Sequence, residues 1–438
     1  MTTPTPPPPE TPTPRAAWSL LLFLTLLNIL NFVDRSLIAS LAPLLIADLG
    51  LSRAQIGLLA GFGFVFFYTL VGLFLGLAAD RWPRFPLVAA GLALWSAMTA
   101  LSGLAKSFVH LAIPRVFVGV GEATLTPAAL SMLGDAFPRR RLGMATGVYY
   151  AGIPLGTAAS LIAAGFVAPR YGWRMCFYVL GLAGLFAVAA LLILKEPPRR
   201  GTAPAGPRPT LGQLGRDVAR SLVERPALAL VLLGGSLLVY GSGAALLVIT
   251  WLVQERGFDF ARAAYLAGLV AVVAGFLGNL CGGLFADWCA RRFSQGRLRS
   301  LVAMTLFFTP FGFGFFLLPL GTPLFYLCWF VAAAGTTAWF GPLFSAIQEL
   351  APDHTRSTTV AFALLVMNLA GVGPGPLVTG LIGDASSLTL GLLISLGVVA
   401  TAIVPFALAA RQLARAAVRG VSAAPGPRDP PGRSTATC

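Results

Sequence analysis

Charged residues are scarce in this 438-residue chain, and several chemically versatile residue types are scarcer still. Only 11% of the residues are charged, and lysine occurs only at Lys106 and Lys195. The sequence has no GxxxxGK loop, which excludes a nucleotide-driven pump of that type. The two histidines, His110 and His354, lie at distant predicted helix ends, so we find neither a nucleophile–base set nor a group of metal ligands. We therefore expect no enzymatic activity, no metal and no cofactor.

Cysteine is also rare, and its spacing carries no signature. The five cysteines show no paired arrangement, and four of them lie in or beside apolar segments: Cys176, Cys281, Cys289 and Cys328. Free cysteine behaves as a small apolar residue in such places. We expect packing rather than disulfides or metal binding.

Long apolar runs dominate what remains. The chain is 57% hydrophobic with a mean hydropathy of +0.81, which excludes an ordinary soluble protein. A helix needs about 20 apolar residues to cross a bilayer core of about 30 Å. Twelve such windows predict an all-α membrane protein with 12 transmembrane helices: 18–45, 55–79, 85–104, 109–133, 142–167, 173–194, 226–253, 261–286, 301–320, 323–347, 358–382 and 388–410.

The net charge of +15 has an uneven distribution along these loops. If the N-terminus is cytoplasmic, most basic residues fall in cytoplasmic loops and tails, including clusters at 139–141, 195–225, 291–299 and 411–433. This asymmetry is the positive-inside pattern. It indicates contact with anionic membrane lipids rather than with nucleic acid. We expect a multi-pass protein of the plasma (inner) membrane with both termini cytoplasmic.

Composition also predicts the domain organisation. We expect residues 1–15 to form a Pro-rich disordered tail. This segment lacks the basic n-region of a signal peptide, so we do not expect it to be a cleaved leader. A six-helix bundle at 16–195 and another at 226–411 flank a linker at 196–225. Apolar residues at helical spacing within 211–222 predict an interfacial helix in that linker. Residues 412–438 form a basic, disordered tail.

Two predicted helices carry ionisable residues where lipid should be. Asp34 and Arg35 interrupt the first apolar run, together with Asn28 and Asn31, and the fourth run carries Arg115 and Glu122. An ionised side chain at mid-bilayer costs roughly 2.5–3.5 kcal/mol even on a lenient scale. Helical spacing gathers each set on one face. Arg115 and Glu122 are about 10 Å apart along their helix, so the natural pairs cross between helices: Glu122 with Arg35, and Asp34 with Arg115 or Arg35.

A loop motif repeats in the two halves. GLAADRWPR (76–84) and GLFADWCAR (283–291) share G-x-x-x-D-x-x-x-R. The six-plus-six layout and this loop resemble the major facilitator superfamily. Within it, NFVDR (31–35), RVFVGVGEATLTPAALSMLGDAFPRRR (115–141) and YYAGIPLG (149–156) resemble the Spinster branch. The resemblance implies a secondary transporter of lysophospholipids or sphingoid phosphates that works by alternating access and is coupled to protons.

The resemblance and the burial of charge suggest roles for these residues. Glu122 and Asp34 are candidates for proton coupling, because arginine stays charged and an acid must switch. Arg35 and Arg115 are candidates for holding an anionic headgroup. A static polar clamp between the two helices is the alternative. The loop motif is interpreted as a conformational latch. The alternative is that its basic residues only determine orientation in the membrane. The motif residues are Gly76, Asp80, Arg81, Arg84, Gly283, Asp287 and Arg291.

Several uncharged polar residues are candidates for lining the substrate cavity. A phenol combines apolar contact with a hydrogen bond, and an intramembrane amide needs a partner. These candidates are Asn28, Asn31, Thr126, Tyr149, Tyr150, Tyr240, Asn279 and Asn368. The expected partners are an amphipathic or lipid substrate, protons and membrane lipids, with the protein acting as a monomer. A transporter of small organic anions or amphipathic drugs, and a receptor or scaffold, remain alternatives.

Overall fold

The computed structural model describes residues 14–79, 82–193, 196, 211–351 and 356–422. Within these ranges the chain is helical and has no β-strand. Twelve helical spans in the described residues are long and apolar enough to cross a membrane, which confirms the predicted all-α fold.

The first six spans contain the following helices, several of them in two or three segments. They are α1 (Pro14–Leu49); α2 (Arg53–Gly57), η1 (Leu58–Phe62) and α3 (Gly63–Ala79); α4 (Arg84–Ser102); α5 (Phe108–Glu122) and α6 (Leu125–Ala136); α7 (Arg139–Tyr150) and α8 (Gly152–Tyr171); and α9 (Trp173–Ile193).

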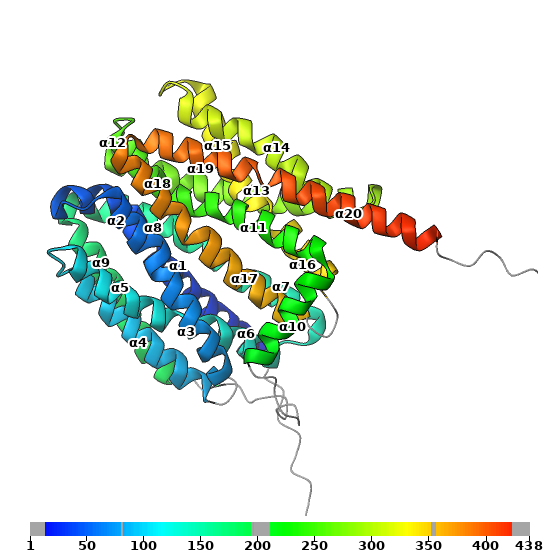
Figure 1. Ribbon diagram of the computed structural model, residues 1–438. Helices are drawn as coiled ribbons and strands as arrows, with labels where there is room; N and C mark the ends of the chain where they lie inside the picture. The colour runs from blue at the N-terminus through cyan, green and yellow to red at the C-terminus, as the bar shows by residue number, and fades with distance from the viewer. Residues whose placement is uncertain (1–13, 80–81, 194–195, 197–210, 352–355, 423–438) are drawn as a thin grey trace, which may run out of the picture.

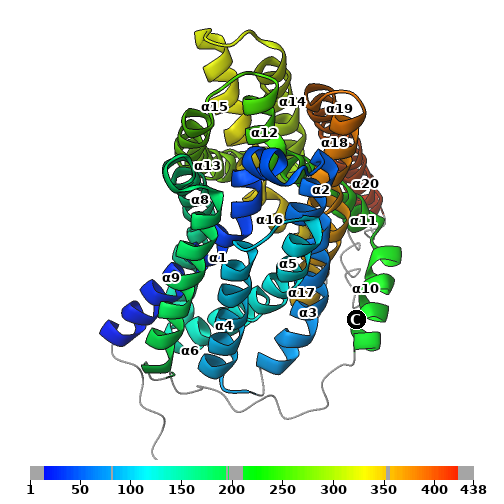
Figure 2. The ribbon, with the colours of Figure 1, turned by 90° about the vertical axis from the view of Figure 1, so that its left-hand side faces the viewer.

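The second six spans follow helix α10 (Leu211–Glu224), which packs outside them against α11 and α17 (Figure 2). They are α11 (Pro226–Ala244), η2 (Ala245–Leu247) and α12 (Val248–Gln254); α13 (Phe260–Arg292); α14 (Gly296–Leu317); α15 (Pro323–Ala338) and α16 (Phe340–Leu350); α17 (Arg356–Met367), η4 (Asn368–Val372) and α18 (Pro374–Ala385); and α19 (Leu388–Ala400) and α20 (Ile403–Ser422).

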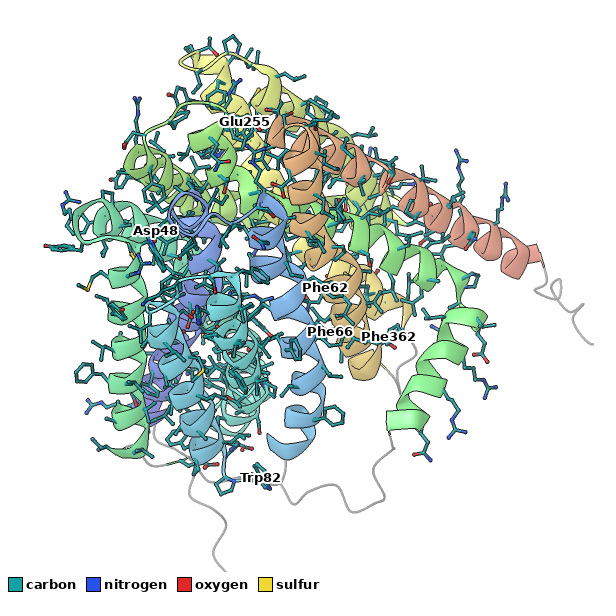
Figure 3. All side chains as sticks on the ribbon, turned by 60° about the vertical axis from the view of Figure 1, so that its left-hand side comes forward. Asp48, Phe62, Phe66, Trp82, Glu255 and Phe362 are labelled. Atoms are coloured by element: carbon teal, nitrogen blue, oxygen red, sulfur yellow. The ribbon has the colours of Figure 1, made fainter. Side chains whose placement is uncertain are left out.

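The two halves meet at one end of the molecule and diverge towards the other (Figure 1). At the end that carries the turns 50–52, 103–107 and 386–387, one apolar core joins both halves, with Leu45 and Ile56 from the first and Trp251 and Phe315 from the second. We call this the closed end. Towards the opposite end, each half has its own core. Figure 3 labels Glu255 and Asp48 near the closed end and Trp82 at the opposite, open end.

Glycine allows the backbones of the two halves to touch at the closed end. The π-helical segment η1 packs against α18. A Cβ added at Gly61 would lie 2.8 Å from the carbonyl oxygen of Gly373, and one at Gly57 would lie 2.8 Å from Cα of Leu377. No side chain fits in such a space, so these glycines set how closely the second and eleventh spans approach.

The helix ends differ from the predicted boundaries in two places. The last helix, α20, continues to Ser422, beyond the predicted bundle boundary at 411 and into the segment predicted to be a disordered tail. The eighth span, α13, extends to Arg292 rather than ending at 286, because its last turns pack at the open end beside the start of α14. The tail 1–13, most of the linker before residue 211, and Asp80 and Arg81 lie outside the described residues.

Candidate functional site

The predicted charged residues of α1 and α5 lie together inside the first half. Arg115 Nη1 lies 3.5 Å from Asp34 Oδ1, and both side chains are buried. The same guanidinium donates from Nη2 to the Arg35 carbonyl oxygen at 2.7 Å, and Thr99 Oγ1 donates to the other Asp34 oxygen. Of the pairs that the sequence left open, Asp34 with Arg115 is therefore the one that forms.

Arg35 is held by aromatic rings rather than by an acid. Its guanidinium carbon lies 4.9 Å from the centroid of the Phe64 ring and 5.0 Å from that of Tyr68. Arg115 lies 4.4 Å from the same Phe64 ring. One phenyl ring thus contacts both guanidinium groups, and cation–π attraction partly offsets the loss of water around them.

Glu122 has a different environment from Asp34. It is the last residue of α5 and is buried, and neither carboxylate oxygen has a hydrogen-bond partner. The predicted Glu122–Arg35 ion pair does not form in this conformation. A buried carboxylate that forms no ion pair is costly in its charged form. The Asn31 amide, whose Nδ2 is also buried, is a polar neighbour of this carboxyl group.

A large cavity lies mainly within the second half. Its volume is about 910 Å³, within the range of small-molecule sites. Helices α1 and α8 line one side, and α11, α13, α14, α15 and α19 line most of the rest. Among the residues that the structure describes, no charged side chain lines it. The polar groups facing it are hydroxyls and amides, among them Ser36, Ser242, Thr336 and Gln348, set among aromatic and aliphatic side chains.

The structure separates the residues predicted to line this cavity into two groups. Tyr150 and Asn279 do line it. The others lie elsewhere in this conformation. Asn28 Nδ2 donates to the Tyr149 carbonyl oxygen at 2.8 Å, and the Tyr149 hydroxyl lies 3.1 Å from Thr126 Oγ1, so these three join α1, α7 and α6. Outside the cavity lining also lie Asn31, Tyr240 and Asn368.

Sequence reasoning missed the hydroxyl residues on the cavity wall. Ser36 Oγ donates to Thr157 Oγ1 at 3.3 Å, and Ser40 Oγ lies 3.2 Å from Ser160 Oγ. Ser36 and Ser40 are one helical turn apart and follow the charged pair of α1, which is the signal that could have revealed them.

At the open end, an arginine near the start of a span binds an acid at the end of the next span in both halves. Arg84 is fully buried, forms an ion pair with Asp135 of α6, and donates from Nε to Glu196 at 2.8 Å. In the second half, Arg297 Nε lies 2.5 Å from Glu349 of α16. The acids occupy matching positions, DAFP (135–138) and ELAP (349–352).

The geometry reassigns part of the predicted latch. Asp287 lies 3.8 Å from Arg297, whereas Arg291, the sequence counterpart of Arg84, is exposed. In the second half, Arg297 rather than Arg291 therefore takes the place of Arg84 in the arginine–acid pair, because α14 begins later than the motif spacing implies. Gly76 lies in α3 and Gly283 in α13, with open space around the latter. In this conformation Arg84 binds groups of its own half.

Glu196 lies outside the membrane spans, and Arg84 sets its ionisation. Burial by itself would raise the pKa of the Glu196 carboxyl. Hydrogen bonds from the Arg84 side chain and from the backbone N–H groups of Arg84 and Phe85 outweigh this and lower the pKa below its ordinary value.

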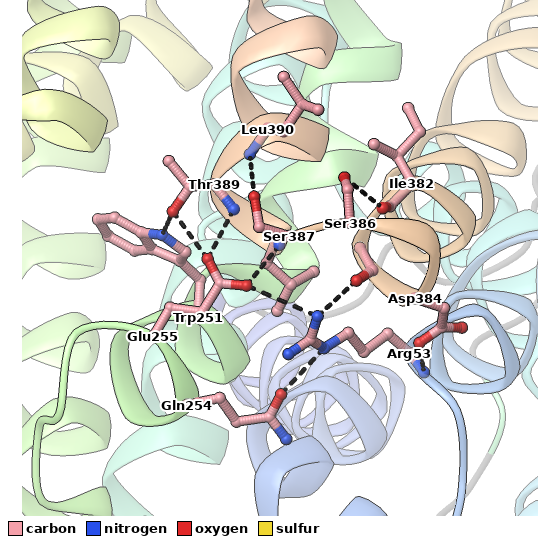
Figure 4. Close-up of polar contacts among 12 residues, drawn as sticks. Arg53, Trp251, Gln254, Glu255, Ile382, Asp384, Ser386, Ser387, Thr389 and Leu390 are labelled. Carbon is pink, nitrogen blue, oxygen red and sulfur yellow. Dashed lines mark hydrogen bonds and ion pairs between the residues drawn. The ribbon is translucent and has the colours of Figure 1, made fainter.

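A polar network joins the two halves at the closed end (Figure 4). Asp384 of α18 accepts hydrogen bonds from the backbone N–H groups of Arg53 and Ala54, each at 2.9 Å, at the start of α2. Arg53 Nη1 donates to the Gly383 carbonyl oxygen at 2.5 Å and lies 3.6 Å from Glu255. Glu255 in turn accepts from the N–H and hydroxyl groups of Thr389.

Comparison with known proteins shows to which family this twelve-span chain belongs. The sequence profile of the Major Facilitator Superfamily matches residues 24–374. The chain belongs to the Major Facilitator Superfamily. Among its relatives in this superfamily is an MFS-type efflux pump of Mycolicibacterium smegmatis, 32% identical over 380 residues, covering 86% of this chain and 87% of the relative.

The Spinster branch of the superfamily is also represented. The sphingosine-1-phosphate transporter SPNS2 of Danio rerio is 24% identical over 387 residues, covering 82% of this chain and 74% of that protein. A crystal structure of a bacterial homologue of the human lysosomal transporter Spinster, in an inward-facing and unoccupied conformation, superposes with a TM-score of 0.80. It is 26% identical and covers 92% of this chain and 99% of its own. This facilitator is therefore a Spinster-like membrane transporter and not an enzyme.

Proposed function

We propose that this facilitator moves an amphipathic, lipid-like substrate, a lysophospholipid or sphingoid phosphate, in exchange for or together with protons. The observation that carries the substrate class is the uncharged, largely apolar lining of the 910 Å³ cavity. An apolar chain gains about 0.8 kcal/mol for each buried CH₂ group. A small organic anion has no apolar chain to bury against that wall.

The charged cluster beside the cavity supports proton coupling. Among the described residues Glu122 is a buried acid that forms no ion pair, whereas Asp34 already has Arg115. Arg35 precedes Ser36, which lines the cavity, and its guanidinium group lies over the rings of Phe64 and Tyr68. Taking up a proton on Glu122 would remove a costly buried charge, and Arg35 would be the cation available to an anionic headgroup. Asp34 and Arg115 would hold the cluster in place.

The proposal extends to orientation and assembly. The open end carries the basic loops, so it would face the cytoplasm of a cell whose plasma (inner) membrane holds the protein. Both termini would then be cytoplasmic. Two six-helix bundles, 16–195 and 226–411, would rock about the closed end as a monomer, with the Arg84 and Arg297 clusters acting as latches.

Uptake into proteoliposomes under an imposed pH gradient tests this function. The assay compares a labelled lysophospholipid with a small organic anion, using the native protein, Glu122→Gln, and Glu224→Gln as a matched control. Glu224 is exposed and forms an ion pair with Arg220 on α10, away from the charged cluster. We expect gradient-dependent lipid movement that is lost in Glu122→Gln and kept in Glu224→Gln.

Each other result identifies a different alternative. Anion movement without lipid movement would overturn the substrate class. Lipid movement that ignores both the gradient and Glu122→Gln would leave the cluster as a static clamp. No movement of either compound would favour a receptor or scaffold.

A second substrate class, amphipathic drugs, is favoured by the efflux-pump relative and by the same neutral cavity. Competition separates it from the lipid. A cationic amphipathic dye that is transported, and whose transport is not reduced by excess lysophospholipid, would support drug efflux instead.

A further inference from the structure

A second hollow lies on the outer surface of the second half, away from the substrate cavity. It is a groove of about 370 Å³ between α14 and α20, which run beside each other (Figure 1). Arg299 and Arg411 lie at its open-end side. Val302 and Leu306 of α14 and Ala407 and Ala410 of α20 line the rest.

The two arginines have no acidic partner within the described part of the chain. Both are exposed, and neither is among the residues that form ion pairs there. The contact recorded for the Arg299 guanidinium is with the Phe293 ring at 5.9 Å. By contrast, Arg297, two residues earlier, binds Glu349 and Asp287. Two like charges side by side at one groove form a positive site that is complementary to an anion from outside the chain.

The shape of the groove adds a second requirement. Arg299 and Leu306 are about two helical turns apart, so the groove runs about 10 Å from the arginines along α14 towards the middle of the span. Small side chains on α20 keep it open, and Leu306 is 57% exposed at its far end. A ligand must therefore be anionic at one end and apolar at the other.

We propose that this groove binds an anionic phospholipid of the surrounding leaflet, with its phosphate between Arg299 and Arg411 and an acyl chain along Val302, Leu306, Ala407 and Ala410. Basic pockets between membrane helices bind such headgroups. The lipid is a structural partner, because the groove is separate from the residues that line the substrate cavity.

Lipid retention measured by native mass spectrometry tests this site without using transport. The full-length protein is purified with equal phosphatidylglycerol and phosphatidylcholine and then titrated with each lipid. The test variants are Arg299→Ala with Arg411→Ala, and Ala410→Leu, which fills the groove and leaves both arginines. The matched control is Arg141→Ala with Arg292→Ala, two exposed open-end arginines outside the groove.

We expect phosphatidylglycerol to be retained over phosphatidylcholine, and its affinity to fall about 30-fold in the double arginine variant, since each interfacial arginine contributes about fivefold. Ala410→Leu should also weaken retention, and the control pair should not. Equal retention in all variants, or equal retention of both lipids, would overturn the proposal. Loss in the arginine variant alone, with inorganic phosphate competing equally well, would overturn it in favour of a free-anion site.

Discussion

Replacing Asp384 by alanine should shift the protein away from the conformation in which its closed end is sealed. Asp384 belongs to α18 of the second half. It accepts hydrogen bonds, at 2.9 Å each, from the first two N–H groups of α2 in the first half. The start of α2 keeps its own capping box without Asp384. Ser52 Oγ accepts from the Gln55 N–H, and Gln55 Oε1 accepts from the Ser52 N–H. The substitution therefore removes a contact between halves and leaves the helix intact.

The size of the shift follows from the two hydrogen bonds. A hydrogen bond to a charged group contributes about 1.5–3 kcal/mol when buried. These two are exposed, so we take about 0.5–1 kcal/mol each. The total of about 1–2 kcal/mol corresponds to a change of about 5-fold to 30-fold in the ratio of the two conformations. The Arg53 side chain keeps its bond to Gly383 and limits the effect.

Distances between spin labels across the closed end measure this ratio. Leu104 lies in the turn of the first half, Leu320 lies in the turn of the second half, and both are exposed. Each is replaced by a labelled cysteine in a background where Cys281 and Cys438 are serine. Asp384→Ala should add a longer distance to the distribution. Asp259→Ala is the control, because Asp259 caps α13 within its own half. An unchanged distribution in Asp384→Ala would refute the view that this network holds the closed end.

Two further predictions concern the open end. Arg84→Ala should destabilise the protein by about 3–5 kcal/mol, because it removes the buried partner of two acids. Thermal unfolding in detergent should show a large fall in the unfolding temperature of this variant and little change for Arg291→Ala. Equal effects of the two substitutions would contradict the assignment. Since the pKa of Glu196 is lowered from an ordinary 4.5, its contribution to stability is complete above that pH and is lost as the pH falls through the lowered value. Unfolding temperatures measured down to about pH 3 should fall more for the native protein than for Glu196→Gln; parallel curves would argue against this ionisation.

The polar face of the candidate site was predictable from spacing, whereas its pairing was not. Helical periodicity places Asp34 beside Asn31, and Arg115 above Glu122, whatever surrounds them. The choice of Asp34 as the partner of Arg115 depends on how α1 and α5 are rotated against each other. The packing of α3 against these two helices brings the Phe64 ring into contact with both guanidinium groups, and no pattern in the sequence encodes that contact.

The cavity illustrates a second limit. Tyr149 and Tyr150 are adjacent in the sequence and chemically alike, yet Tyr149 is fully buried between helices and Tyr150 lines the cavity. Successive helical residues point about 100° apart, so one residue of register decides which phenol reaches the substrate space. The sequence identified both as candidates and had no means to rank them.

By itself, the sequence determined that the chain spans a membrane twelve times, which spans carry charge, and that a loop motif recurs in both halves. These properties depend on composition and local spacing, since a bilayer demands apolar length from every span separately. The tertiary structure decided which end is sealed, which charges pair and where the cavity lies. Those outcomes arise between residues as distant as Arg53 and Asp384, because they depend on how whole helices pack, and packing is a property of the assembled bundle.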